Sequence, residues 1–340
     1  MPQKTRKPVT LKDIAAETGF SITTVSHALR DMSDISEATK NVIRERANTL
    51  GYIGNASASS LRSGFSKTVA VLLGDLSNPH FSFMAKEIEM LLRQSGYSAF
   101  FMNTNENEDV ERSALMLALS KQVDGIILCP TQNNGSSDNL RFLLNTHTPC
   151  VLIGRHFTDI NASCVACDDH RGGYLAGTHV LQRGHRHILY VDTPFKNSSA
   201  VERREGFLQA LQESSEPVRF SVIPFDENGE YIKTLITPQK NPYSAIIAFN
   251  DLIAWDILCR LPAYGLRVPD DVSLVGFDNI HSCLPLPFPL TSVSSSKIHM
   301  PRKAVELLME QIRNPSIPAT RLILDVELID RNTVLPLSQP

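Results

Sequence analysis

The sequence of 340 residues contains no apolar run near the roughly 18 residues that a membrane-spanning helix needs. Its basic start, residues 4–7, is followed by Pro8 and an amphipathic segment, not by the apolar core of a signal peptide. These absences predict a protein that stays in the cytoplasm and has no membrane partner.

Cysteine is scarce: six residues are scattered from Cys129 to Cys283, which is not the spacing of a secreted disulfide framework. Cys164 and Cys167 form a C-x-x-C pair, but neither a second pair nor a histidine at zinc-binding spacing accompanies them. We interpret both as small strand residues, with a metal or redox site as the minor alternative. We expect no metal and no cofactor.

Common catalytic signatures are missing as well: there is no G-x-G-x-x-G, G-x-x-x-x-G-K-[ST], G-x-S-x-G or H-E-x-x-H. Gly172 and Gly177 have the spacing of a phosphate-binding loop, but Thr178 follows where lysine is required. Three histidines cluster nearby, at His179, His185 and His187. For these we favour a surface role over metal binding. The sequence therefore does not indicate an enzyme.

Charge is unevenly distributed along the chain, whose net charge is −3. Residues 1–64 carry nine Lys and Arg against six Asp and Glu, whereas the remainder carries 24 against 30. A basic head on an acidic body indicates a polyanionic partner for the head alone. The length also exceeds what one hydrophobic core usually supports, so two or three domains are expected.

The start of the chain has the apolar spacing of short helices. Thr10, with Asp13 three residues later, is a candidate N-cap for a first helix, which Gly19 ends. Ser21 is the candidate cap of a second helix after a short turn. The apolar positions of the two helices are Leu11, Ile14 and Ala15, then Ile22, Val25 and Leu29. This spacing predicts a helix-turn-helix.

A third helix is expected from Ser36 to about Leu50, with Gly51 as its stop. Its predicted inward-facing residues are Val42, Ile43, Ala47 and Leu50. Residues 52–66 are rich in Ser, Gly and Ala with little to bury, which is the composition of a linker. We therefore place a helix-turn-helix domain at 1–51 and a hinge at 52–67.

From residue 68 onward, short apolar strands alternate with helical stretches, which predicts parallel sheets covered on both faces by helices. Strands are expected at 69–73, 99–102, 125–128, 151–153, 188–191, 246–248 and 273–276, with helices at 172–182, 201–211 and 252–261. The predicted fold class is an all-α head plus an α/β core of two doubly wound parallel-sheet subdomains. Ligands bind between such units, at the carboxyl ends of their strands.

Eight segments carry a resemblance that covers essentially the whole chain: VTLKDIAAETGFSITTVSHAL, LGYIGNASASSLRSG, DLSNPHF, GHRHI, ERREGF, AFND, VPDDVSLVGFDN and PLTSV. In this order and spacing they resemble the LacI/GalR family. The resemblance implies a sequence-specific regulator, most often a repressor, whose affinity for double-stranded operator DNA is modulated by a small-molecule effector. It also implies a periplasmic-binding-protein-like core at 68–340, with an N-subdomain at about 68–165 and 292–324 and a C-subdomain at about 166–291 and 325–340.

For the head, the resemblance implies that the helix after Ser21 enters the major groove. Ile22, Thr23 and His27 match the base-reading positions. His27 stands where an arginine is common, and a histidine cannot form the arginine's two-bond contact with guanine. Thr24, Ser26 and Asn55 fit phosphate contacts better than base contacts, and the remaining expected DNA-binding residues are Thr10, Ser21 and Ala58. The alternative is an exposed helix face without a partner.

For the hinge, the resemblance implies a short helix that forms only on operator DNA, with Leu61 as a wedge in the minor groove. A ligand that changes the spacing of two hinges in a dimer would keep them from folding together. The alternative is that Leu61 packs on the core.

For the core, the resemblance implies an effector held in the cleft between the subdomains. Arg203 matches the family's effector-binding arginine, Asp278 its acidic partner, and Asn250 with Asp251 a further polar pair. A guanidinium fork and a facing carboxylate suit a small polar ligand. Two structural alternatives remain: Arg203 and Asp278 could pair only with each other, and Asp251 could cap the next helix. Weaker candidates from the N-subdomain are Asp75, Asn78, Phe81 and Arg155.

The identity of the effector stays open. A sugar or sugar derivative is the family-level expectation, although purines and other small polar ligands occur in relatives, and an inducer and a corepressor would use the same cleft. Gly154 stands where many relatives have an acid, which puts one sugar contact in doubt. Trp255, the only tryptophan, could stack on a sugar ring or belong to the core or an interface.

One helix-turn-helix reads only a few base pairs, so specific binding implies a two-fold dimer on a near-palindromic site. The final DRNTVLPLSQP contains no leucine heptad, which favours a homodimer over a tetramer. The rival classes are an enzyme, opposed by the missing motifs, and a periplasmic solute-binding protein, opposed by the head and by the missing signal peptide.

Overall fold

The computed structural model describes residues 9–54, 64–132, 137–235, 243–284, 288–296 and 298–337. The chain divides into two units, Met1–Ser66 and Lys67–Pro340. Each unit has a hydrophobic core of its own. Among the described residues, no helix is both long enough and apolar enough to cross a membrane.

The described part of the first unit is a bundle of three short helices: α1 (Leu11–Thr18), α2 (Ile22–Leu29) and α3 (Glu37–Leu50). They pack around a buried cluster of Ile14, Val25, Ala28, Ile43 and Ala47. The spacing of these apolar residues in the sequence matches one face of each helix. The predicted helix-turn-helix is confirmed.

The predicted caps of these helices are also present. The Asp13 carboxylate accepts hydrogen bonds from the amide and the hydroxyl of Thr10. Ser21 Oγ accepts one from the Thr24 amide at 3.0 Å. Gly51 ends α3 with a φ of 71°, a left-handed conformation that glycine adopts without steric cost.

One inward-facing residue of α3 is predicted wrongly. The Val42 side chain is 51% exposed, whereas Ile43 and Ala47 are buried. Ile43 and Ala47 lie four residues apart and share one helix face, while each single step turns the helix by about 100°. Val42 is therefore carried out of the core.

The first subdomain of the second unit is a six-stranded parallel sheet in the order β11-β5-β4-β3-β1-β2. Its strands are β1 (Thr68–Leu73), β2 (Ser98–Asn103), β3 (Gly125–Leu128), β4 (Cys150–Ile153), β5 (Ser163–Cys167) and β11 (Arg321–Leu324). The strands expected at 69–73, 99–102, 125–128 and 151–153 are present as β1 to β4. Cys164 and Cys167 are buried strand residues of β5, as interpreted.

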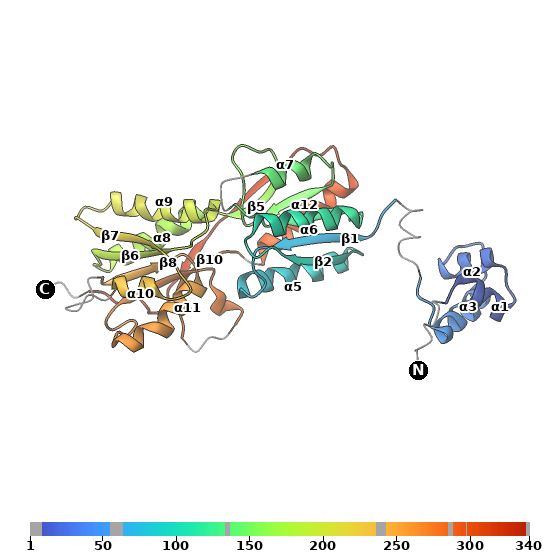
Figure 1. The fold of residues 1–340 in the computed structure, drawn as a ribbon, viewed down its shortest axis with the longest axis horizontal. Helices are drawn as coiled ribbons and strands as arrows, with labels where there is room; N and C mark the ends of the chain where they lie inside the picture. The colour runs from blue at the N-terminus through green and yellow to red at the C-terminus, as the bar shows by residue number, and fades with distance from the viewer. Residues whose placement is uncertain are drawn as a thin grey trace. The chain divides into compact units, whose positions relative to one another are not determined.

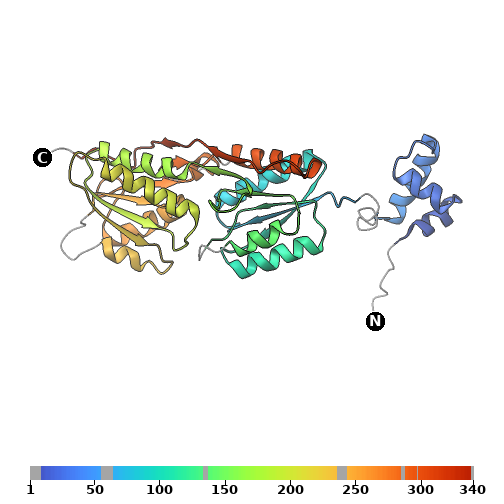
Figure 2. The same cartoon turned by 90° about the horizontal axis from the view of Figure 1, so that it is seen from above.

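Helices cover both faces of this sheet. Val69, Val71 and Leu73 of β1 face a core shared with α5 (Pro79–Gln94) and α12 (His299–Arg313). Ala70 and Leu72 face the opposite core, with α6 (Glu108–Ser120) and α7 (Asp138–Leu144). The alternation follows from the two-residue period of a strand. Figure 2 shows α12, near the red end of the colour scale, on the lobe of this first sheet.

The second subdomain repeats the plan with the strand order β12-β10-β9-β8-β6-β7. Its strands are β6 (His187–Asp192), β7 (Arg219–Pro224), β8 (Ala245–Ala248), β9 (Ser273–Phe277), β10 (Thr291–Ser294) and the antiparallel β12 (Glu327–Ile329). Helices α8 (Asp169–Gln182) and α9 (Ser198–Gln212) pack on one face, and α10 (Glu230–Leu235) and α11 (Asp251–Arg260) on the other (Figure 1). Two short 3-10 helices, Leu261–Tyr264 and Ile280–Ser282, follow α11 and β9.

The chain passes between the two sheets three times: after β5, after β10 and between β11 and β12. The first two crossings fall later than expected, because β5 extends to Cys167 and β10 to Ser294, beyond the expected boundaries at 165 and 291. Short apolar strands do not reveal in the sequence which sheet they join. The strands β7, β10, β11 and β12 are not among those predicted from the sequence.

The histidine cluster is partly internal. His185 is 1% exposed, and its ring nitrogens lie 3.0 Å from Ser244 Oγ and from the Leu335 carbonyl oxygen. Burial lowers the pKa of His185, and burial together with Arg183 lowers the pKa of His179 to about 4. The expected surface role is therefore wrong for His185, which fastens the C-terminal segment to the second sheet.

Helices α8 and α9 approach each other at backbone distance. A Cβ on Gly173 would lie 1.9 Å from the Arg203 carbonyl oxygen, and a Cβ on Gly206 would lie 1.9 Å from the His170 carbonyl oxygen. Real Cβ atoms never come so close to another atom, so only glycine fits at these two positions. The close contact of α8 and α9 therefore sets the distance between Arg203 and the sheet.

Gly173→Ala should therefore lower the free energy of unfolding by about 1–3 kcal/mol, because the new methyl group meets backbone that cannot rotate away. Urea unfolding followed by the fluorescence of Trp255, the single tryptophan, measures the change. Glu205→Ala, at an exposed position of α9, is the matched control and should change it little. Equal stability of the two variants would contradict the close contact.

Candidate functional site

The exposed face of α2 carries most of the residues expected to read DNA. Ile22 is 44% exposed although it is apolar, and Thr23 beside it is exposed as well. The Ser21 and Thr24 hydroxyls lie 2.8 Å apart at the start of the helix. His27 Nδ1 lies 2.6 Å from Asp34 Oδ2, which leaves one ring nitrogen for a further partner.

The described part of the head is not itself basic. Residues 9–54 carry five Lys and Arg against six Asp and Glu, and Lys4, Arg6, Lys7 and Arg62 lie outside the described residues. Asp31 Oδ1 lies 2.5 Å from Arg44 Nη2 and 2.9 Å from Lys40 Nζ. The positive charge of the head therefore belongs mainly to its flanks. The expected DNA contacts Asn55, Ala58 and Leu61 also lie outside the described residues.

A cavity of about 920 Å³ lies between the two subdomains and is lined by both. Asp75, Asn78, Phe81 and Arg155 of the first subdomain and Arg203, Asn250 and Asp278 of the second contribute to its wall. Several of these residues follow the carboxyl ends of parallel strands or begin the next helix, the position at which doubly wound sheets bind ligands. The structure thus brings seven of the eight expected effector-binding residues together.

Arg203 is the central charged group of the second subdomain's wall. Its Nε donates to Asp169 Oδ1 at 2.7 Å, and its Nη1 donates to the Phe249 carbonyl oxygen at 2.8 Å. Asp278 Oδ1 lies farther away, 3.6 Å from Nη2. The guanidinium also lies over the Phe277 ring, with Cζ 3.5 Å from its centroid. Although burial alone would lower the pKa of Arg203, the charges of Asp169 and Asp278 outweigh it and raise the pKa.

Arg155 holds the equivalent place in the first subdomain. Its two terminal nitrogens donate to the two carboxylate oxygens of Glu106 at 2.6 and 2.7 Å, and Nη1 also reaches the Pro130 carbonyl oxygen at 3.0 Å. Burial opposes the charge of Arg155, but the Glu106 carboxylate raises its pKa above the ordinary value. Both guanidinium groups of the cavity are therefore charged and already paired.

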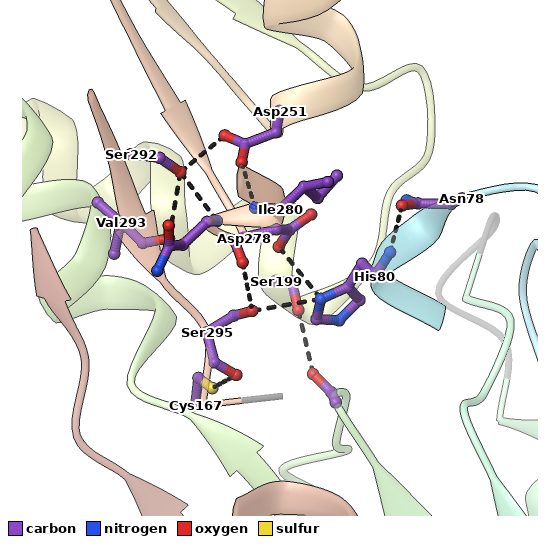
Figure 3. Close-up of polar contacts among 12 residues, drawn as sticks. Asn78, His80, Cys167, Ser199, Asp251, Asp278, Ile280, Ser292, Val293 and Ser295 are labelled. Carbon is purple, nitrogen blue, oxygen red and sulfur yellow. Dashed lines mark hydrogen bonds and ion pairs between the residues drawn. The ribbon is translucent and has the colours of Figure 1, made fainter. Parts of the chain in front are cut away.

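Asp251 is the exception among the expected effector-binding residues. Its carboxylate accepts hydrogen bonds from the Ile280 amide and the Ser292 hydroxyl, both at 2.7 Å, and it does not line the cavity (Figure 3). The side chain that caps α11 is that of Asn250, which accepts from the Ile253 amide. Asp251 instead ties α11 to the segments that follow β9 and β10, so its placement in the effector site is corrected.

His80 of α5 reaches across to the second subdomain. Its Nδ1 lies 3.2 Å from Ser295 Oγ and 3.8 Å from Asp278 Oδ1 (Figure 3). Serine, histidine and aspartate here do not form a catalytic triad, because both oxygens lie at the same ring nitrogen, whereas a triad uses opposite nitrogens. Asp278 has a φ of 100°, a strained backbone that brings its carboxylate to this meeting point.

Other contacts between the subdomains were not predicted. The Ser198 amide at the start of α9 donates to Gln132 Oε1 at 2.9 Å, and His156 Nε2 lies 3.0 Å from Glu202 Oε1. Asn197, also missed, lines the cavity and is 2% exposed. Its Oδ1 caps α9, while its Nδ2 is buried and has no hydrogen-bond partner among the described residues. Only its place before a helix could have marked it in the sequence.

Two family profiles match the chain. The profile of bacterial regulatory proteins of the lacI family matches residues 10–55. The profile of periplasmic binding proteins and the sugar binding domain of the LacI family matches residues 66–331. The two matches coincide with the two units of the structure.

Individual relatives agree with the profiles. An HTH-type transcriptional repressor PurR of Actinobacillus pleuropneumoniae serotype 3 (strain JL03) is 32% identical over 309 residues, which cover 89% of this chain and 91% of the relative. The structure of a LacI-family transcriptional regulator from Silicibacter pomeroyi aligns with a TM-score of 0.81 at 25% identity, over 95% of this chain and 98% of that one. A LacI-family regulator from Enterococcus faecium, solved with bound ribose, aligns with a TM-score of 0.69 at 27% identity, over 80% of this chain and 100% of that one.

A helix-turn-helix head followed by a two-lobed ligand-binding core defines a DNA-binding transcriptional repressor and not an enzyme. The chain belongs to the LacI family of bacterial regulatory proteins.

The distances around Arg203 rank its two acidic partners. Asp169→Asn should lower the free energy of unfolding by about 3 kcal/mol, because it leaves a buried guanidinium with only the more distant carboxylate. Asp278→Asn should cost less, and asparagine tolerates the left-handed φ at that position. Urea unfolding of both variants, followed by Trp255 fluorescence, compares them. A larger loss for Asp278→Asn would show that the 3.6 Å contact is the more important one.

Proposed function

We propose that this regulator binds a near-palindromic operator as a homodimer in the cytoplasm and that a sugar-like effector in the cavity changes its affinity for DNA. One observation carries the proposal: the chain combines an exposed α2 face with a cavity whose polar wall comes from two subdomains. A ligand that contacts both subdomains can favour one arrangement of them over another. Such coupling is typically worth about 1–3 kcal/mol.

The α2 face supports specific roles for its residues. Ile22 and Thr23 are exposed and available to base edges in the major groove. His27 uses Nδ1 for Asp34, so it offers a base one hydrogen bond through its other nitrogen. Thr10 and Ser21 cap α1 and α2, and Thr24 lies in the first turn of α2, where hydroxyls and amides suit phosphate contacts. Ser26, in the middle of α2, offers a hydroxyl for the same kind of contact.

The effector site is proposed from the residues that meet in the cavity. Asp75, Asn78, Phe81 and Arg155 would contact the ligand from one side, and Arg203, Asn250 and Asp278 from the other. The ribose-bound Enterococcus faecium regulator supports a sugar as the ligand class. Because His80 and Gln132 already bridge the subdomains, a bound ligand would add to or replace these contacts and so shift their relative position.

Thr23→Ala should weaken binding to the preferred operator by about 10- to 100-fold, as expected for the loss of one base contact. Fluorescence anisotropy on a palindromic DNA library at two salt concentrations, with and without a panel of sugars, measures this affinity and any ligand response. Thr49→Ala, an exposed threonine of α3, is the matched control and should bind like the wild type. Absence of sequence-selective binding by the wild type would refute the proposed function.

The homodimer is tested separately by the mass of the free protein. Sedimentation equilibrium should give about twice the chain mass of 37.7 kDa at micromolar concentration. A monomer that pairs only on DNA would contradict the proposed dimer of the free protein, and a fourfold mass would replace it with a tetramer.

A further inference from the structure

The cavity contains more negative than positive side chains. Glu106, Asp169 and Asp278 line it together with the two arginines that they contact. Four further carboxylates, those of Asp75, Asp226, Glu227 and Asp256, line it as well. Seven carboxylates therefore face two guanidinium groups, and these are the residues that would recognise a charged ligand.

Both guanidinium groups already face acidic partners of the protein. Arg155 gives its two terminal nitrogens to Glu106 in a bidentate pair. Arg203 gives Nε to Asp169 and Nη1 to a backbone carbonyl, and its Nη2 faces Asp278 at 3.6 Å. A phosphate or carboxylate on the ligand would have to displace a buried carboxylate from its partner, and leaving that group unpaired costs several kcal/mol.

Other positive contributions do not balance this charge. Arg260, outside the cavity wall, donates to Asp256 at 2.6 Å and neutralises that one carboxylate. The helices α5, α8, α9 and α11 begin at the cavity, and each N-terminus contributes about half a positive charge, or about two in total. The excess of four carboxylates that remains is larger, even with His80 of the wall counted as positive, so we expect a negative potential in the cavity.

The uncharged groups of the wall suit a hydroxylated ring. Asn197 offers a buried Nδ2 donor that has no partner within the described ranges, and a ligand oxygen could accept its hydrogen bond. The carboxylates of Asp75, one oxygen of which accepts from Ser77, and of Glu227 can accept hydrogen bonds from hydroxyl groups. Phe195, Phe225 and Trp255 supply flat apolar surface, on which the face of a sugar ring can stack.

We infer, building on the proposed function, that this cavity selects an uncharged polyhydroxylated ligand and excludes its phosphorylated or carboxylated counterpart, with Asn197 donating to a ligand oxygen. Discrimination arises because the two arginines neutralise the protein's own acids. A ligand hydroxyl can both accept from Asn197 and donate to a carboxylate, whereas an anion meets only repulsion from the remaining acids.

Trp255 allows the charge of the cavity to be measured without knowing the ligand, because it is the only tryptophan and it lines the cavity. Its fluorescence is quenched with caesium, acrylamide and iodide at a constant ionic strength of about 0.1 M, where the screening length is about 10 Å. Relative to free N-acetyltryptophanamide, the ratio of caesium to iodide quenching constants should be raised at least about twofold. A ratio equal to or below that of the free compound would overturn the inference.

Two variants separate the local charge from that of the whole protein. Glu227→Gln removes a carboxylate of the cavity wall and should lower the caesium preference. Glu310→Gln makes the same change on the exposed side of α12 and should leave the preference unaltered. Equal effects of the two variants would show that quenching reports net charge and would count against the inference.

Ligand binding gives the second readout. In calorimetry with ribose and ribose 5-phosphate, and with trehalose and trehalose 6-phosphate, the neutral member of a pair should bind at least about tenfold more tightly. Asn197→Ser, which keeps a helix-capping oxygen but removes the amide donor, should weaken that binding about fivefold without changing the caesium preference. Tighter binding of a phosphorylated member would overturn the inference. Operator binding is scored independently by anisotropy, so a failure of the proposed function is distinguishable.

Discussion

The buried Arg203 guanidinium is the interaction on which the ligand-binding core depends most. A charge this deep is tolerated only because Asp169, a backbone carbonyl and Asp278 surround it. These partners come from α8, from the end of β8 and from the segment after β9, so one side chain joins the helical layer to the sheet edge. The glycines that bring α8 and α9 into backbone contact place Arg203 where it can reach them.

The three crossings between the sheets make the cavity a shared property of both subdomains. Neither subdomain encloses the cavity alone, and the polar contacts between the subdomains include those of His80 with Ser295, of Gln132 with Ser198 and of His156 with Glu202. Polar bridges of this kind exchange readily with water or ligand, in contrast to a continuous apolar interface. A ligand can therefore change the relation of the subdomains without disturbing either core.

The head is stabilised in a different way from the core. Its buried cluster is small, and the helices are fixed by caps and by glycines at their ends as much as by packing. Within the described head, Lys40 and Arg44 pair with Asp31, and Arg46 pairs with Glu17. Four further basic residues belong to the flanking parts of the sequence.

Much of the fold could be predicted from the sequence. The caps at Thr10 and Ser21, the helix-turn-helix and the buried strands β1 to β4 depend on neighbouring residues, and periodicity reveals such local order directly. The ordered motifs also predicted that Arg203, Asn250 and Asp278 belong to one site. The inward-facing position of Val42 and the surface role of His185 were predicted wrongly, because the side on which a residue packs depends on elements distant in sequence.

Only the tertiary structure decided how the charged residues of the site are shared. The sequence contains Arg203, Asp169 and Asp278 without showing that Asp169 lies closer to the guanidinium. Its motifs predicted that Asp251 contacts the ligand, whereas the Asp251 carboxylate accepts hydrogen bonds from Ile280 and Ser292. Motifs record which residues are present, whereas ion pairing depends on distances of a few ångströms between segments that folding brings together. The sequence by itself therefore determined the class of protein and predicted seven residues that line the cavity, whereas the three-dimensional packing determined which other groups join them and how their charges are paired.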